Sequence, residues 1–164
     1  MTSQASPVRE RAQLVRLRAL RTRAAERHCE ACRREVAEAC AAVEIREARV
    51  AEWRRLRTAL AAWVVGPGAQ ELARFAAPAT ARRQHLAEQH ERDEYALRGE
   101  VRELEAARER LMRARAHWMR ERLREDEARG MLRGATRAAI IAREELQATE
   151  LAEAAALRGA GAWR

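Results

Sequence analysis

The residues best equipped for chemistry are one histidine and three cysteines gathered in a short stretch. His28, Cys29, Cys32 and Cys40 follow one another closely in the chain. On a helix, Cys29 and Cys32 share a face and His28 lies four residues before Cys32, so a zinc or redox site is geometrically conceivable. Covalent haem attachment would need a histidine directly after the second cysteine, where this chain has Arg33.

The same cysteines also suit a structural role, because Cys29 and Cys32 fall where a coiled coil needs small apolar side chains. A free cysteine behaves as a small hydrophobe when it is buried. Three cysteines are an odd number and do not form a disulfide framework. We therefore favour core cysteines over metal ligands, and we expect no cofactor.

The sequence lacks the other motifs that are typical of catalytic sites. It has no glycine-rich phosphate loop, no Ser/His/Asp set and no paired carboxylates placed for a pocket. We therefore predict that the protein is not an enzyme.

The elements that would hold these residues are two long helices. Proline-free stretches, residues 8–66 and 79–164, flank one interior break, Gly66-Pro67-Gly68. Ser6-Pro7 is a helix start, Gly66 can end the first helix in a left-handed cap, and Pro67 prevents its continuation. A single domain is expected, with a helix over about 7–65, a turn over about 66–79, a helix over about 80–158 and a frayed tail over 159–164.

A seven-residue register runs along both helices. Its members in the first helix are mostly β-branched: Val8, Val15, Thr22, Cys29, Val36, Val43, Val50, Arg57 and Val64. In the second they are mostly leucine: Leu97, Leu104, Leu111, Trp118, Glu125, Leu132, Ala139, Leu146 and Glu153. Such heptads predict an all-α, elongated antiparallel two-helix coiled-coil hairpin, in which residue i faces roughly residue 145 − i. A parallel oligomer of straightened chains and a single charged helix are the alternatives.

Composition and charge further limit the structural class and the binding partners that this chain could have. The chain has 33 basic residues, all arginine, a net charge of +8 and only 4% aromatic residues, which fits a thin seam better than a thick core. Basic excess in residues 1–34 could face nucleic acid, an acidic membrane surface or an acidic protein groove. Because no base-reading pattern accompanies it, nucleic acid is the less favoured partner. The polar start and the lack of a long apolar run predict a cytoplasmic protein without stable membrane insertion.

Two apolar surfaces remain to be explained. The turn region holds five large apolar side chains, more than the end of a hairpin can hide, which leaves partner contact and simple packing both open. They are Trp63, Val64, Val65, Leu72 and Phe75. The last twenty-odd residues extend beyond the start of the first helix. They are too apolar to form a helix that is exposed to solvent on all sides, so they would contact another protein or a second copy. The overhang contains Ile140, Ile141, Leu146, Leu151 and Leu157.

Residues 7–158, a short basic hairpin rich in Arg, Ala and Glu, resemble the stalk proteins of type III secretion. These are the flagellar FliJ and the injectisome YscO-type family, including its Hrp branch, and they look like the two terminal helices of the rotary γ subunit. The resemblance implies a non-enzymatic central stalk that links a hexameric secretion ATPase to the export gate. It also implies a virulence role, secretion chaperones as further partners, and a place peripheral to the inner-membrane secretion apparatus.

Carried over to this chain, the resemblance implies two contact regions. Residues 7–34 and 115–158 would enter the ATPase ring, with contacts from Arg16, Arg18, Arg21, Arg23 and Arg27. Residues 63–76 would face the export gate, with contacts from Trp63, Leu72 and Phe75. The alternative function is a basic coiled coil that binds nucleic acid or a scaffold that associates with itself.

Overall fold

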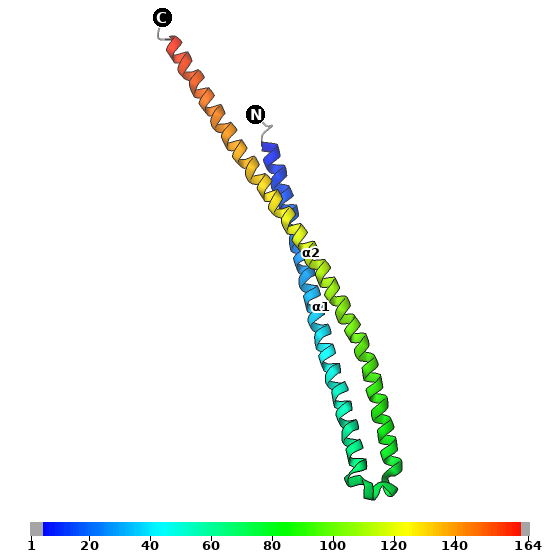
Figure 1. Ribbon diagram of the computed structural model, residues 1–164. Helices are drawn as coiled ribbons and strands as arrows, with labels where there is room; N and C mark the ends of the chain where they lie inside the picture. The colour runs from blue at the N-terminus through cyan, green and yellow to red at the C-terminus, as the bar shows by residue number, and fades with distance from the viewer. Residues whose placement is uncertain (1–4, 162–164) are drawn as a thin grey trace. The chain divides into compact units, whose positions relative to one another are not determined.

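The computed structural model describes the backbone of residues 5–161, which form two long α-helices joined by a short 3₁₀ helix (Figure 1). Helix α1 spans Ala5–Val65, η1 spans Pro67–Glu71, and α2 spans Leu72–Gly161. Side chains are described for all of these residues except 5–6, 72–73 and 157–161. The two helices pack against each other, and the described chain contains no strand. The predicted all-α helical hairpin is confirmed.

The end of α1 differs in detail from the expected cap. The N–H of Gly66 donates to the carbonyl of Ala62 at 3.0 Å, and the N–H of Ala69 donates to the carbonyl of Gly66 at 3.1 Å. No described residue has a positive φ, so the predicted left-handed cap at Gly66 is wrong. Gly66 instead continues the bonding pattern of α1, and Pro67, which has no N–H to continue it, begins η1.

Helix α2 begins at Leu72, earlier than the start near residue 80 that Pro78 led us to expect. Pro78 lies inside α2, in its second turn. The missing N–H leaves the carbonyl of Arg74 without its helical donor, but both residues are exposed and water can bond to this oxygen. The helix also continues through Gly159 to Gly161, where a frayed tail was expected. Residues 162–164 of that tail lie outside the described residues.

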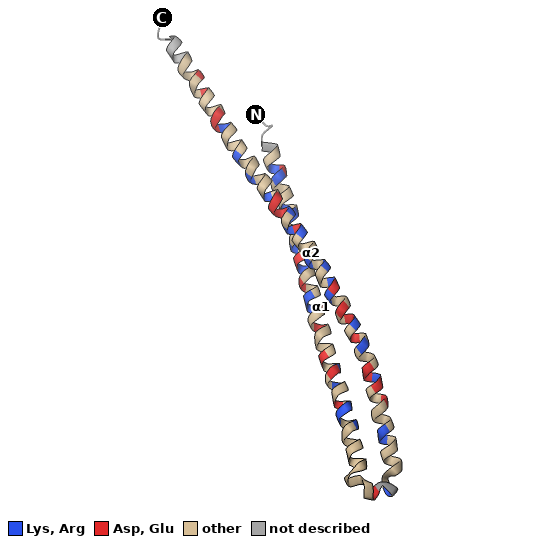
Figure 2. Ribbon diagram, viewed as in Figure 1, with Lys and Arg blue, Asp and Glu red and all other residues tan. Residues whose placement is uncertain are grey.

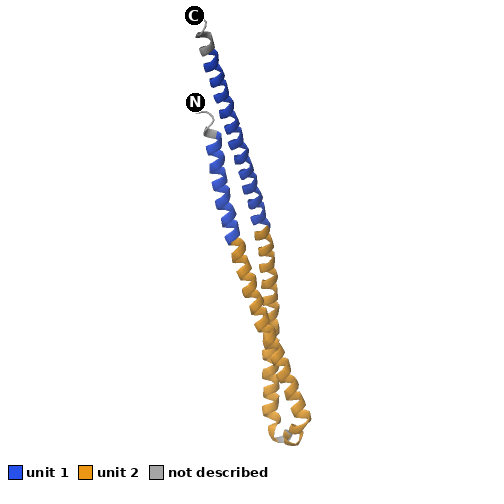
Figure 3. Ribbon diagram, turned by 90° about the vertical axis from the view of Figure 1, so that its left-hand side faces the viewer, with its two compact units in different colours: residues 1–27, 116–164 blue, residues 28–115 orange. Residues whose placement is uncertain are grey.

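The chain divides into two compact units, each with a part of both helices (Figure 3). Unit 2 comprises His28–Arg115 and therefore contains the turn. Its helices meet along a seam, the row of side chains through which α1 and α2 pack, and Cys29, Cys32, Leu111 and Ala114 form a buried cluster there. The seam continues toward the turn through further buried residues: Val43, Val50, Leu86, Leu104 and Ala107.

Unit 1 comprises Met1–Arg27 and Ala116–Arg164. Among its described residues, the buried apolar ones are alanines, in contrast to the leucines and valines of unit 2: Ala25, Ala128 and Ala135. Arg11 donates from Nη1 to the carbonyl of Met131 at 3.3 Å, a pairing close to the register 145 − i. Beyond the start of α1, the last turns of α2 have no α1 residue opposite them (Figure 1).

Charged residues of both signs follow one another along both helices (Figure 2). In the described part of the chain, no helix has a run of apolar residues long enough to cross a membrane.

Candidate functional site

The cysteines are part of the seam of unit 2. Cys29 and Cys32 are buried and pack with Leu111, whereas Cys40 is half-buried. The Nε2 of His28 lies 3.9 Å from the Sγ of Cys32. Among the described residues, no three His, Cys, Asp or Glu side chains come together as a metal centre requires. The packing of Cys29 and Cys32 is that of small core residues.

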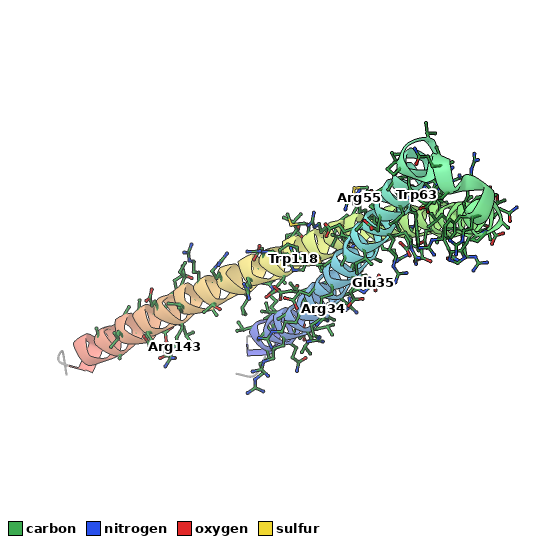
Figure 4. The ribbon with its side chains drawn as sticks, turned by 90° about the horizontal axis from the view of Figure 1, so that it is seen from below. Arg34, Glu35, Arg55, Trp63, Trp118 and Arg143 are labelled. Carbon is green, nitrogen blue, oxygen red and sulfur yellow. The ribbon has the colours of Figure 1, made fainter. Side chains whose placement is uncertain are left out.

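Trp63 marks the turn end of α1 in unit 2 (Figure 4). Its indole ring covers Gly68, which is buried within η1. A Cβ added at Gly68 would lie 2.8 Å from three ring atoms of Trp63. The close packing of this ring therefore depends on the absence of a side chain at Gly68.

An apolar patch is exposed around the turn. We call Trp63, Val65 and Phe75 the tip patch; Trp63 and Phe75 are each 37% exposed and Val65 is 84% exposed. The guanidinium of Arg74 lies 5.5 Å from the ring centroid of Phe75, within the range of a cation–π contact. The side chain of Leu72, the third predicted contact, lies outside the described residues. Trp63 and Phe75 thus remain available to a partner.

The five arginines predicted to contact a partner divide into two groups within unit 1. Arg18 turns toward the seam, where its Nη1 lies 3.8 Å from Oε2 of Glu121. The other four are exposed and make no ion pair within the described residues; we call Arg16, Arg21, Arg23 and Arg27 the basic row. The basic row is therefore free to meet acidic groups of another molecule.

A polar cluster that the sequence reading missed lies in the seam of unit 2. Arg46 donates two hydrogen bonds to Oε1 of Glu100, at 3.0 and 2.8 Å, and one to Oδ1 of Asp93 at 2.7 Å. Trp53 donates from Nε1 to the other carboxylate oxygen of Asp93 at 2.6 Å. We call these four residues the Arg46 cluster. It joins both helices through charge-assisted bonds, which are stronger than neutral ones.

The hydrogen bonds of the Arg46 cluster shift the pKa values of two of its members, Asp93 and Arg46. The bond from Trp53, followed by the bond from Arg46, lowers the pKa of Asp93 below its usual 3.8 against the opposing effect of burial. The bonds to Glu100 and then to Asp93 raise the pKa of Arg46. Arg46 and Asp93 therefore both stay ionised at neutral pH.

A second polar group lies closer to the turn and is centred on His90, which is buried. Arg54 donates from Nε to Nε2 of His90 at 3.2 Å and from Nη2 to Glu94 at 2.8 Å. Arg57 approaches the other ring nitrogen of His90 at 3.3 Å. The hydrogen bond from Arg54 lowers the pKa of Glu94. Like the Arg46 cluster, this group ties α1 to α2.

Unit 1 contains a buried carboxylate as well. The side chain of Glu121 is only 5% exposed, and its Oε1 accepts a hydrogen bond from Arg124 at 2.5 Å. Its Oε2 has no hydrogen-bond partner among the described residues, because Arg18 is 3.8 Å away. The hydroxyl of Thr22 donates to the backbone carbonyl of Glu121 at 3.3 Å.

A signal for these polar pairs was present in the sequence. The seven-residue register of Leu97 and Leu104 also includes His90 and Trp118, and the positions three residues after His90, Leu97 and Trp118 are Asp93, Glu100 and Glu121, which places these acids on the seam. Arg18 and Arg46 interrupt the first helix at facing positions, so each acidic interruption has a basic one opposite. Buried pairs of this kind set the register between two helices more than they add stability.

No family model, no curated protein and no solved structure matches this chain.

Proposed function

We propose that this protein is a non-enzymatic central stalk of a type III secretion system, which couples a hexameric secretion ATPase to the export gate from the cytoplasmic side of the inner membrane. The observation that carries the proposal is the helical hairpin itself, with an apolar patch exposed at its turn. The two contact surfaces follow from the resemblance of the sequence to the stalk family.

The proposed mechanism is mechanical and allosteric. The basic row of unit 1 contacts acidic or carbonyl groups of successive ATPase subunits, and the unequal faces of the two helices make these contacts asymmetric. The tip patch of unit 2 binds an apolar site on the export gate. Polar clusters that join α1 to α2, such as the Arg46 cluster, keep the helices in register while force passes along them.

Secretion measured in cells that carry tip variants tests the gate contact. Phe75→Ala and Leu72→Ala are expected to abolish secretion with no loss of helical circular dichroism, because they remove proposed partner contacts and Phe75 is 37% exposed. Tyr95→Ala is the matched control, since Tyr95 is 72% exposed and lies away from the turn. Normal secretion by both tip variants would remove the tip patch from the proposal.

A pull-down tests the ATPase contact. The tagged chain is recovered from its own lysate with nuclease present, at about 0.15 and 0.5 M salt, and the retained proteins are identified. The stalk proposal predicts a hexameric secretion ATPase or a gate protein at both salt concentrations. Replacing the four arginines of the basic row with alanine should release the ATPase. The matched control replaces four other exposed arginines, Arg82, Arg83, Arg92 and Arg98.

Nucleic-acid binding is the second candidate, and the lack of ion pairs along the basic row favours it. It predicts an affinity that falls by several decades between about 50 and 200 mM salt, for roughly six to ten phosphate contacts. Loss of every partner on treatment with nuclease would support this candidate and refute the stalk.

A further inference from the structure

Unit 1 has two exposed surfaces that complement each other in charge and in apolar character. The first is the overhang, residues 141–156 of α2, together with Ile140 just before it. The second lies on the outer face of α1, around Leu17 and Leu20. The first surface is acidic and the second is basic, and both expose large apolar side chains.

The overhang exposes large apolar side chains on one side of α2. Ile140 and Leu151 are eleven residues apart, which is about three turns, so they lie on one side of α2. They are 52% and 69% exposed, and Ile141 beside them is 54% exposed. Glu144 lies on the same side, four residues after Ile140. This face therefore carries apolar side chains toward its two ends, with Glu144 and Gln147 between them.

All charged residues of the overhang are acidic except Arg143 at its start, which Figure 4 labels. Its acidic residues are Glu144, Glu145, Glu150 and Glu153. All four are exposed and make no ion pair within the described part of the chain. Two overhangs packed on each other would bring these like charges together, so a basic surface is the better complement.

The outer face of α1 supplies that complement. Leu17 and Leu20 are 46% and 61% exposed, on the side of α1 that points away from the seam. Arg21 follows Leu17 by four residues and Arg16 precedes Leu20 by four, so the two arginines flank the leucine pair. Both belong to the basic row and have no ion pair within the described residues.

The lengths of the two segments agree. At 1.5 Å per residue, the sixteen residues of the overhang reach about 24 Å beyond the start of α1. Leu20 lies fifteen residues, or about 22 Å, inside that start. If the open ends of two copies meet head to head, the overhang of each reaches the leucine pair of the other.

We propose that the overhang of one copy binds the Leu17–Leu20 face of a second copy, so that two chains form a closed antiparallel dimer through two identical contacts. Each contact places Leu151 beside the leucine pair and Glu150 and Glu153 beside Arg16 and Arg21 of the other copy, while Ile140 and Ile141 lie near the start of its α1. A twofold axis closes the assembly at two copies. The dimer covers part of the basic row, so it competes with any partner that this row binds.

A charge exchange tests the dimer on the purified full chain, without any secretion partner. One variant is Glu150→Arg/Glu153→Arg and the other is Arg16→Glu/Arg21→Glu. Each alone brings like charges together in both contacts, and its dimer dissociation constant is expected to rise by about tenfold or more. A mixture of the two variants restores opposite charges in both contacts, so a heterodimer of near wild-type affinity is expected.

Sedimentation velocity over about 1 to 100 μM protein measures the association at about 0.05, 0.15 and 0.5 M salt. The wild type is expected to be dimeric at low salt and to dissociate as salt rises. The control, Glu88→Arg/Glu91→Arg, reverses two exposed charges of unit 2 and should dimerise like the wild type. Circular dichroism confirms that each variant stays helical. A monomeric wild type at low salt, or a mixture that fails to associate, would overturn the proposal.

Discussion

Replacing the buried Glu121 with leucine is expected to stabilise unit 1. This side chain is 5% exposed and lies on the seam, where its neighbours in the register are apolar. Its Oε2 accepts no hydrogen bond from the described residues. A leucine of similar length would fill the same space without a desolvated charge.

The size of the effect follows from the contacts that change. A buried oxygen without a hydrogen bond costs about 1–3 kcal/mol, which the substitution recovers. It removes two ion pairs, to Arg18 and Arg124, whose side chains are 25% and 52% exposed. Pairs with such exposed partners contribute about 0.2–1 kcal/mol each. We therefore expect Glu121→Leu to raise the free energy of unfolding by about 1–2 kcal/mol, within the range known for buried pairs replaced by apolar residues.

Urea unfolding followed by helical circular dichroism measures this change. With an m value of about 2 kcal/mol/M, the midpoint should rise by about 0.5–1 M. Glu127→Leu is the matched control, because Glu127 is exposed, and it should change the free energy by less than about 0.5 kcal/mol. If Glu121→Leu lowers the midpoint while the control leaves it unchanged, the carboxylate stabilises the seam and the reasoning is refuted.

Two further substitutions probe unit 2. Because the hydrogen bond from Trp53 holds the pKa of Asp93 below 3.8, this bond stabilises the fold above that pH and the gain is lost as the pH falls toward the lowered pKa. Trp53→Phe should therefore flatten the fall of the urea midpoint between about pH 5 and pH 2, and parallel curves for variant and wild type would contradict the assignment. Gly68→Ala puts a methyl group 2.8 Å from the ring of Trp63 and should lower the free energy of unfolding by about 1–3 kcal/mol, with quenching by iodide reporting a more exposed indole. Gly99→Ala, which meets nothing within 4 Å in the interior of α2, should instead raise it by about 1 kcal/mol, and equal effects at the two glycines would exclude the contact with Trp63.

The architecture could be predicted because two local signals agree with each other. The valines at intervals of seven require a partner along one face of α1, and the Gly66-Pro67-Gly68 break supplies the interior point at which the chain could turn back. Once the turn is placed, the pairing follows from counting, as Glu35 and Arg110 show by their contact at 3.2 Å. Both the seven-residue spacing of apolar residues and the break that lets the chain reverse direction can be seen in a single sequence.

The rest depended on contacts between residues far apart in the chain. Pro78 predicts a helix boundary by itself, but exposed backbone near the start of a helix tolerates the bond that it removes. The register places Asp93 and Glu100 on the seam, but that one guanidinium binds both is visible only once Arg46 is placed between them. Exposure at the turn was equally hard to judge, because whether Trp63 is covered depends on how η1 folds beneath it.

The bonds of Arg46 have a consequence for how the hairpin arm of unit 2 can change its length during evolution. Asp93 and Glu100 are seven residues apart on α2, and one guanidinium holds both. A deletion of seven residues from α2 alone, between the turn and Asp93, would slide the helix by about 10 Å. Arg46 would then lie between Glu100 and Ala107, and Asp93 would lose its arginine. Insertions and deletions should therefore persist only as matched pairs, with one heptad gained or lost in each helix. The arms of related proteins would then differ in length by whole heptads.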